Sequence, residues 1–246
     1  MWPSWKKSLP SPQPKGVLIK TSLVDYPERV AAAYFLRGCN LRCPYCYNTE
    51  LVEPSVQDNV QFVSVDEVLS HLKKRANVLT GFVISGGEPL CHPQTVKELI
   101  LRSRSLGYKI KLDTNGMFPD RLKELLADKD VAPDYIALDV KTSPGRYREL
   151  NGQDGEQKIL ESIKIVSALL PSAREFRTVL YPPLDSAAEI KELASLLPKD
   201  ARWRFAHFLN GRCLSAAAQS VQAYAETEEN ALVEIARKKI PGASLR

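Results

Sequence analysis

The sequence predicts an α/β fold built on a parallel β-sheet, and three observations support this prediction. Short apolar segments alternate with longer segments of helical periodicity up to about residue 206. Such alternation is typical of parallel sheets with crossover helices. The polar motifs directly follow the apolar segments, as they do at the carboxyl ends of strands in parallel α/β folds. The chain has 246 residues, 44% of them hydrophobic, which suffices for one domain with a substantial core.

Six segments have the length and composition of strands: residues 31–36, 81–85, 108–112, 135–138, 175–179 and 202–206. Between them apolar residues recur three and four positions apart, as at Leu122, Leu125 and Leu126, which predicts crossover helices. Pro93 fits a helix start and Gly107 fits a helix end. We expect the six parallel strands to curve into an incomplete, TIM-like (β/α)6 barrel with the polar motifs at its carboxyl-end mouth.

The chain is expected to have two parts. Residues 1–15 are rich in proline and predict an N-terminal arm, while residues 16–246 predict a single domain. From about residue 216 that domain continues as a helical region, because Leu232, Ala236 and Ile240 recur on one face.

Composition argues against several classes of partner. Lys and Arg number 34 against 29 Asp and Glu, and the basic residues are scattered, so we expect neither a nucleic-acid partner nor a membrane partner. Apolar runs fall far short of the roughly 18 residues that a membrane-spanning helix needs. No secretory signal pattern is visible at the N-terminus, and we therefore expect a cytoplasmic protein.

Three of the five cysteines fall within eight residues, at Cys39, Cys43 and Cys46. This CxxxCxxC pattern directly follows the first predicted strand, and three thiolates on one loop can hold a 4Fe-4S cluster with one iron left open. A structural zinc site is the alternative, but it needs a fourth protein ligand, and the nearest candidates, among them Cys91 and Cys213, lie far along the chain. Both are expected to be ordinary buried thiols.

Three further motifs follow the next predicted strands. Gly86, Gly87 and Glu88 belong to a Ser-Gly-Gly-Glu-Pro sequence, in which the glycines let the backbone approach a ligand and the glutamate offers a carboxylate to an ammonium group. The alternative for this motif is a plain strand-to-helix turn.

Acidic residues follow the third and fourth strands. Asp113 and Asp139 can bind ribose hydroxyls, an ammonium group or a small cation, and Lys141 can neutralise a carboxylate. Solvated loop charges are the alternative interpretation of these residues.

The cysteine motif and the Gly-Gly-Glu-Pro motif together resemble the radical S-adenosylmethionine (SAM) superfamily from residue 16 to about residue 211. The resemblance implies a 4Fe-4S cluster and SAM as cofactors. It implies that Cys39, Cys43 and Cys46 bind the cluster. It also implies that the amine and carboxylate of SAM chelate the open iron, and that Tyr45 lies near the adenine.

The sequences Leu-Asp-Thr-Asn-Gly at 112–116, Leu-Asp-Val-Lys at 138–141 and Leu-Asn-Gly at 150–152 narrow the resemblance to activating enzymes of glycyl-radical enzymes. Residues 16–27 and the Gly-Cys-Asn sequence at 38–40 are similar to activators of anaerobic ribonucleoside-triphosphate reductase. That group implies hydrogen abstraction from a glycine of the reductase, or of a pyruvate formate-lyase-like enzyme. The implied electron donor is a flavodoxin or a ferredoxin.

The same resemblance implies roles for individual residues. Asp113, Thr114 and Asp139 correspond to loops that bind SAM and a monovalent cation, and Lys141 and His207 correspond to residues that contact SAM. A strand-end histidine is also often structural, since it can bond to nearby backbone. The sequence departs from the group at Tyr47, where a histidine is frequent, and at Glu28, where glycine is usual.

Two alternatives remain open at this point. The first is a radical SAM enzyme that acts on a small molecule, such as a 7-carboxy-7-deazaguanine synthase. The second is a non-enzymatic iron–sulfur or zinc protein that senses redox state.

Overall fold

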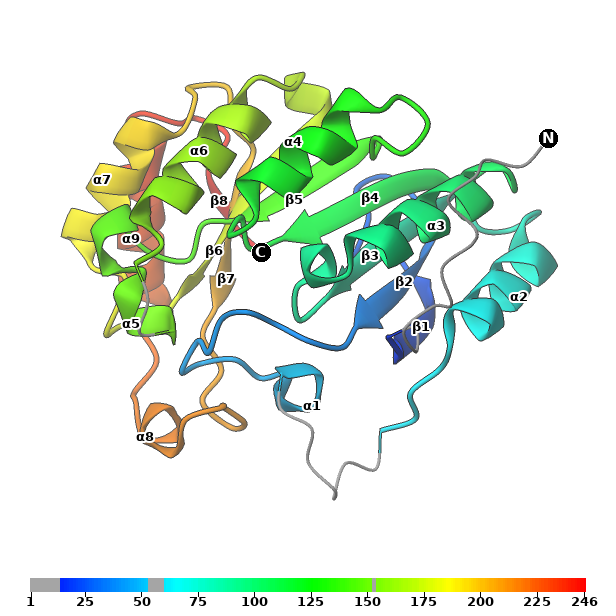
Figure 1. The fold of residues 1–246 in the computed structure, drawn as a ribbon. Helices are drawn as coiled ribbons and strands as arrows, with labels where there is room; N and C mark the ends of the chain where they lie inside the picture. Colours follow the sequence, from blue (N-terminus) through cyan, green and yellow to red (C-terminus); the bar gives the residue numbers. More distant parts are fainter. Residues whose placement is uncertain (1–13, 53–59, 152–153) are drawn as a thin grey trace.

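The computed structural model describes residues 14–52, 60–151 and 154–246. Most of the expected N-terminal arm therefore lies outside the described residues, and so does Gly152. One eight-stranded sheet follows the order of the chain (Figure 1). Strand β1 is antiparallel to β2, and every other neighbouring pair is parallel. The strands are β1 (Gly16–Ser22), β2 (Ala31–Leu36), β3 (Gly81–Gly86), β4 (Lys109–Thr114), β5 (Tyr135–Asp139), β6 (Arg174–Leu180), β7 (Trp203–His207) and β8 (Ser244–Leu245).

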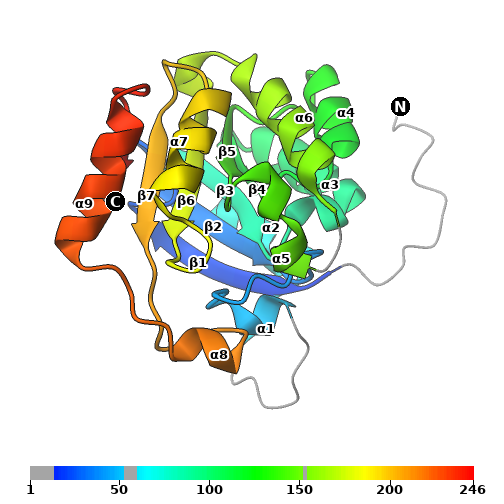
Figure 2. The ribbon, with the colours of Figure 1, turned by 90° about the vertical axis from the view of Figure 1, so that its left-hand side faces the viewer.

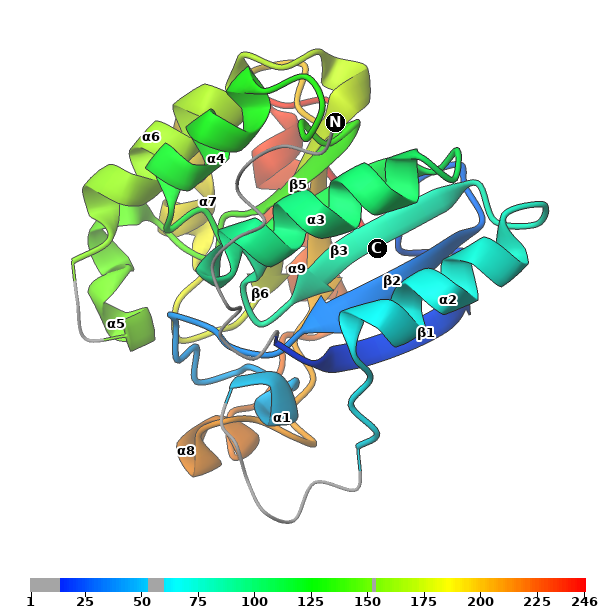
Figure 3. The ribbon, with the colours of Figure 1, turned by 45° about the vertical axis from the view of Figure 1, so that its right-hand side comes forward.

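The longer helices cover one face of this sheet. The α-helices of the described residues are α1 (Thr49–Val52), α2 (Val65–Arg75), α3 (Pro93–Arg104), α4 (Pro119–Ala127), α5 (Arg148–Asn151), α6 (Glu156–Ser167), α7 (Ala187–Leu196), α8 (Ala216–Gln219) and α9 (Glu226–Arg237). Helices α2 and α3 lie over the first strands (Figure 3), while α9 lies at the edge that carries β7 (Figure 2). Neighbouring helices pack in pairs: α2 with α3, α4 with α6, and α7 with α9.

The two faces of the sheet differ in chemistry because side chains alternate along each strand. The helix-covered face carries a large apolar core that includes Tyr34, Phe82, Phe176 and Trp203, all fully buried. The opposite, inner face carries a small apolar cluster around Val83 and charged side chains, among them Lys111, Asp113 and Arg177.

The fold class predicted from the sequence is confirmed. The six predicted strands occur as β2–β7, with ends within two residues of those expected. Strands β1 and β8, which the sequence analysis missed, occupy the two edges of the sheet and are not paired with each other, so the barrel is incomplete. The predicted C-terminal helical region holds α8 and α9 with residues 220–225 between them.

No helix in the part of the chain that the structure describes is long and apolar enough to span a membrane.

Candidate functional site

The cysteine loop, residues 37–48, follows β2 and packs against the turn that follows β3. The Gly87 N–H donates to the Leu36 carbonyl at 2.9 Å, and the Glu88 N–H donates to the Gly38 carbonyl at 2.8 Å. A Cβ at position 87 would lie 2.3 Å from the Gly38 oxygen and 3.0 Å from Cβ of Cys39. Glycine is therefore required here, because the cysteine loop fills the space of a side chain.

Gly86 is constrained by the same packing. Its φ of 135° lies in the region that favours glycine, and a Cβ there would lie 2.2 Å from the Leu36 carbonyl oxygen. The two glycines predicted to approach a ligand thus allow the end of β3 to approach the end of β2.

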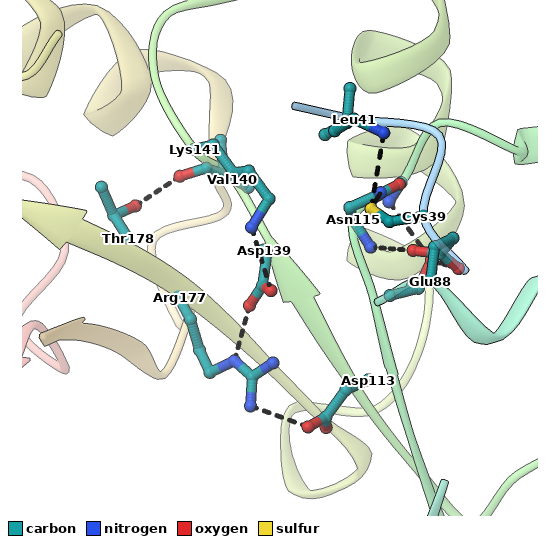
Figure 4. A network of polar contacts seen from close by, with 12 residues as sticks. Cys39, Leu41, Glu88, Asp113, Asn115, Asp139, Val140, Lys141, Arg177 and Thr178 are labelled. Carbon is teal, nitrogen blue, oxygen red and sulfur yellow. Dashed lines mark hydrogen bonds and ion pairs between the residues drawn. The ribbon is translucent and has the colours of Figure 1, made fainter. Parts of the chain in front are cut away.

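Glu88 is fully buried, and both of its carboxylate oxygens accept hydrogen bonds from the protein. Oε1 accepts from the Leu90 N–H and the Thr114 hydroxyl, each at 2.9 Å. Oε2 accepts from the Asn115 N–H at 2.6 Å, and Figure 4 shows these two residues. Burial raises the pKa of Glu88 to about 7, although these hydrogen bonds oppose the rise. Glu88 therefore ties the turn after β3 to the turn after β4.

Asn115 extends this connection to the cysteine loop. Its Nδ2 donates to Oδ1 of Asn40 at 2.9 Å and to Sγ of Cys39 at 3.8 Å. Glu88 and Asn115 together fix the first cysteine relative to β4. The sequence analysis quoted Asn115 within a motif but gave it no role.

The three thiols of the cysteine loop lie in a desolvated environment. Burial raises the pKa of Cys43 to about 12 and raises the pKa values of Cys39 and Cys46, while the ammonium group of Lys141 opposes each increase. Thiols of this kind become thiolates when bound metal supplies positive charge.

The donor set fits an iron–sulfur cluster, because three thiols on one loop can each bind a different iron. No group of three or more His, Cys, Asp or Glu side chains in residues 14–52, 60–151 and 154–246 is arranged to hold a single metal ion.

Asp113 and Asp139, on neighbouring strands, share one guanidinium. Arg177 of β6 donates from Nη1 to Oδ2 of Asp113 at 3.1 Å and from Nε to Oδ1 of Asp139 at 2.7 Å (Figure 4). Lys111 Nζ lies 2.8 Å from Oδ1 of Asp113. Burial alone would raise the pKa of Asp113, but Arg177 and Lys111 lower it to about 2. Both aspartates are thus held ionised, and the sequence analysis predicted neither Arg177 nor Lys111.

Lys141 connects the paired aspartates to the cysteine loop. Its Nζ lies 3.4 Å from Oδ2 of Asp139, and its backbone N–H donates to the Tyr147 hydroxyl at 3.0 Å. Burial opposes the charge of Lys141, but Asp139 and the thiols of Cys43 and Cys39 raise its pKa. The result is a row of alternating charges that runs from Lys111 through Asp113, Arg177 and Asp139 to Lys141.

Tyr45 of the cysteine loop lies in an aromatic row. Its ring centroid lies 5.0 Å from that of Tyr181, which in turn lies 4.8 Å from that of Phe208. The Tyr45 hydroxyl is buried and has no hydrogen-bond partner among the described residues. Burial raises the pKa of Tyr45, so this hydroxyl stays protonated and is available as a donor.

The side chain of His207, at the end of β7, contacts helix α9. Its Nδ1 lies 2.6 Å from Oε2 of Glu229, a nearly fully buried residue of α9. Its bond to Glu229 directs that ring nitrogen toward α9, and none of the hydrogen bonds found in the described residues joins His207 to another predicted site residue.

Every predicted site residue lies in the cysteine loop or at the carboxyl end of a strand from β3 to β7. Helices α1 and α8 flank the same end in all three ribbon views. The residues just before α8 contact α1 and the cysteine loop, because Arg212 lies 3.0 Å from Glu50 of α1 and the Ser215 N–H donates to the Pro44 carbonyl at 3.0 Å. The C-terminal segment therefore supports the cysteine loop, which the sequence analysis did not predict.

Comparison with protein-family models matches residues 34–197 to the radical SAM superfamily. A protein of Methanocaldococcus jannaschii, provisionally named as a glycyl-radical enzyme activating enzyme, is 30% identical over 182 residues, which cover 72% of this chain and 72% of that protein. The 7-carboxy-7-deazaguanine synthase of Hyperthermus butylicus is 28% identical over 191 residues, covering 69% of this chain and 77% of the synthase. The crystal structure of QueE from Escherichia coli has a TM-score of 0.58 at 14% identity, with 95% of this chain and 93% of that chain covered. This last likeness concerns the fold alone.

Proposed function

Because this chain belongs to the radical SAM superfamily, we propose that it activates a glycyl-radical enzyme, with anaerobic ribonucleoside-triphosphate reductase as the first candidate partner. The observation that carries the proposal is the relative at 30% identity over 72% of the chain, whose provisional name gives that activity. The sequences at 16–27, 112–116 and 138–141 resemble the same group. A pyruvate formate-lyase-like enzyme is the second candidate partner.

Membership in the superfamily implies a 4Fe-4S cluster and SAM, and a structural neighbour of similar fold is bound to SAM. When bound and reduced by one electron, these cofactors supply a deoxyadenosyl radical that can abstract hydrogen. The protein contributes binding, orientation and exclusion of water.

The cysteine loop has the donors for the cluster, and neighbouring loops hold it in position. Cys39, Cys43 and Cys46 would bind iron through their thiolates. Glu88 has a positioning role through its bonds to the turn after β4, and its contact with the ammonium group of SAM stays a prediction.

The charged residues of the mouth suit a zwitterionic ligand. Lys141 would neutralise the methionyl carboxylate, while Asp113 and Asp139 would receive the ammonium group, the ribose hydroxyls or a monovalent cation together with Thr114. Arg177 keeps both aspartates ionised and oriented. The aromatic row of Tyr45 would cover the adenine and exclude water. His207, whose Nδ1 bonds to Glu229, would contact SAM through its other ring nitrogen.

The proposal is tested by mixing anaerobically reconstituted protein with SAM, dithionite and the anaerobic reductase of the source genome. We expect the electron paramagnetic resonance doublet of a glycyl radical on the reductase, together with deoxyadenosine. Replacing the acceptor glycine of the reductase by alanine should remove the doublet. Release of deoxyadenosine without a doublet would leave the superfamily chemistry intact and would reject this partner.

One observation favours a second candidate function. The synthase of Hyperthermus butylicus covers a similar share of this chain at 28% identity, so a small-molecule substrate of the 7-deazapurine type is the alternative. Formation of a 7-deazapurine product, with no radical on any glycyl-radical enzyme, would support it.

A further inference from the structure

A cavity lies away from the cysteine loop, at the open edge of the sheet. The cavity has a volume of about 400 Å³ and lies between strands β6 to β8 and the segment that joins β1 to β2. Its lining includes the side chains of Arg202, Arg204 and Arg246, together with Glu175 and Val24.

The side-chain charges of this cavity are unbalanced. Its one side-chain carboxylate, Glu175, is already engaged, because Oε1 lies 3.5 Å from Lys111 Nζ and Oε2 accepts from the Tyr135 hydroxyl at 3.3 Å. None of the ion pairs found within the described ranges joins Arg202, Arg204 or Arg246 to a carboxylate. Three arginine side chains therefore line one cavity without a side-chain ion pair of their own among the described residues.

Two of these guanidinium groups are held in place by neutral partners. Arg204 Nη1 donates to the Ser244 hydroxyl and to the Gly242 carbonyl, and Arg246 Nη2 donates to the Val24 carbonyl. Neutral partners leave the positive charge uncompensated. Since each guanidinium has five N–H donors, most donors remain available to a ligand.

We propose that this cavity binds an oxyanionic group, a carboxylate or a phosphate, through Arg202, Arg204 and Arg246. Guanidinium groups match the planar oxygens of such groups with paired, charge-assisted hydrogen bonds. The group belongs either to a free small molecule or to an acidic side chain of a polypeptide. Val24 at the rim is 68% exposed and its neighbour Leu23 is 75% exposed, so a larger ligand has apolar surface to contact.

The test measures binding to the full chain by calorimetry at constant ionic strength, because surface charge effects depend on salt. Three probes are used: inorganic phosphate, succinate and a short oligoglutamate peptide. We expect at least one probe to bind the unchanged protein and a Lys123→Gln control equally, and to bind Arg202→Gln at least about tenfold more weakly. Binding of phosphate or succinate identifies a free small molecule as the source, and binding of the peptide alone identifies a polypeptide.

Arg246→Gln is the second variant, because the side-chain hydrogen bond of Arg246 goes to an exposed backbone carbonyl, that of Val24. Thermal unfolding midpoints establish that each variant is folded. Equal affinity of both arginine variants and the control for every probe, or no binding by the unchanged protein, would overturn the proposal. Neither the cluster nor SAM takes part in this measurement, so its outcome is independent of the proposed function.

Discussion

On the helix-covered face of the sheet, Phe82, Phe176 and Trp203 are fully buried among other apolar side chains, whereas the inner face of the same sheet carries Lys111 and Arg177. Each large apolar side chain stabilises the fold by about 1.5–3 kcal/mol through burial. Buried ion pairs contribute little net stability, because desolvation offsets most of their attraction. The contrast indicates that the helix-covered face, the outer face, provides stability, while the inner face holds charged groups in fixed positions.

The largest expected effect concerns the cysteine loop, where the inner face ends. Cys43→Ala removes a thiolate ligand, so anaerobically reconstituted protein should lose its 4Fe-4S cluster and all reductive cleavage of SAM. Iron content and visible absorbance measure the cluster directly. Cys213→Ala is the matched control, because this buried thiol bonds to the Leu209 carbonyl and should leave iron content unchanged. Full iron content in Cys43→Ala would show that the ligand assignment is wrong.

The next largest expected effect is a loss of stability at the outer face. Trp203→Ala should lower the free energy of unfolding by about 3–5 kcal/mol, because it opens a cavity in the core. It also removes the indole donor to the Thr178 hydroxyl at 3.0 Å. Urea unfolding of the apoprotein measures the loss. Leu170→Ala, at a side chain that is 72% exposed, should change stability by less than about 0.5 kcal/mol. Similar losses for both variants would contradict the assignment of stability to the outer face.

The inner face is tested by SAM affinity. Lys141→Ala should weaken SAM binding by about tenfold to a hundredfold, the usual result of losing one charge-assisted hydrogen bond. Asp139 keeps its bond to Arg177 in this variant, so cluster absorbance should be unchanged. Equilibrium binding of SAM to the reconstituted protein provides the measurement. An affinity equal to that of Lys123→Ala, an exposed control on α4, would remove Lys141 from the site.

Much of the architecture could be predicted because its signals are local. The alternation of apolar segments with segments of helical periodicity predicted β2–β7. The cysteine motif could be recognised because Cys39, Cys43 and Cys46 lie close together in one loop. Strand β8 was missed because it has two residues, too few for a recognisable pattern. Strand β1 was missed because its residues were interpreted only as a family resemblance, although the segment has strand composition.

The missed parts of the site depend on pairings between distant residues. Arg177 lies 38 residues from Asp139 and 64 from Asp113, so no local spacing indicates their contact. The role of Glu88 depends on the turn after β4, which determines whether its oxygens meet protein donors or a ligand. A charged residue within a predicted buried strand, as at Lys111 and Arg177, was the available signal, because buried charges need partners.

The smallest effect we predict is a pH dependence that belongs to the inner face alone. The folded-state pKa of Asp113 is about 2 against an ordinary value of 3.8, owing to Arg177 and Lys111 acting against burial. A depressed carboxyl pKa contributes stability that is fully present above 3.8 and is lost as pH falls through about 2. The difference corresponds to about 2 kcal/mol.

Asp113→Asn cannot ionise, so it should be less stable than the unchanged protein at pH 6, and the gap should narrow steadily as pH falls from about 4 toward 2. Urea unfolding at a series of pH values gives both free energies. Glu192→Gln is the control, since Glu192 is exposed on α7 and should show a small gap that stays constant. A constant gap for Asp113→Asn would mean that Arg177 and Lys111 do not hold this carboxylate ionised. The inner face would then lack the fixed negative charge that distinguishes it from the outer face.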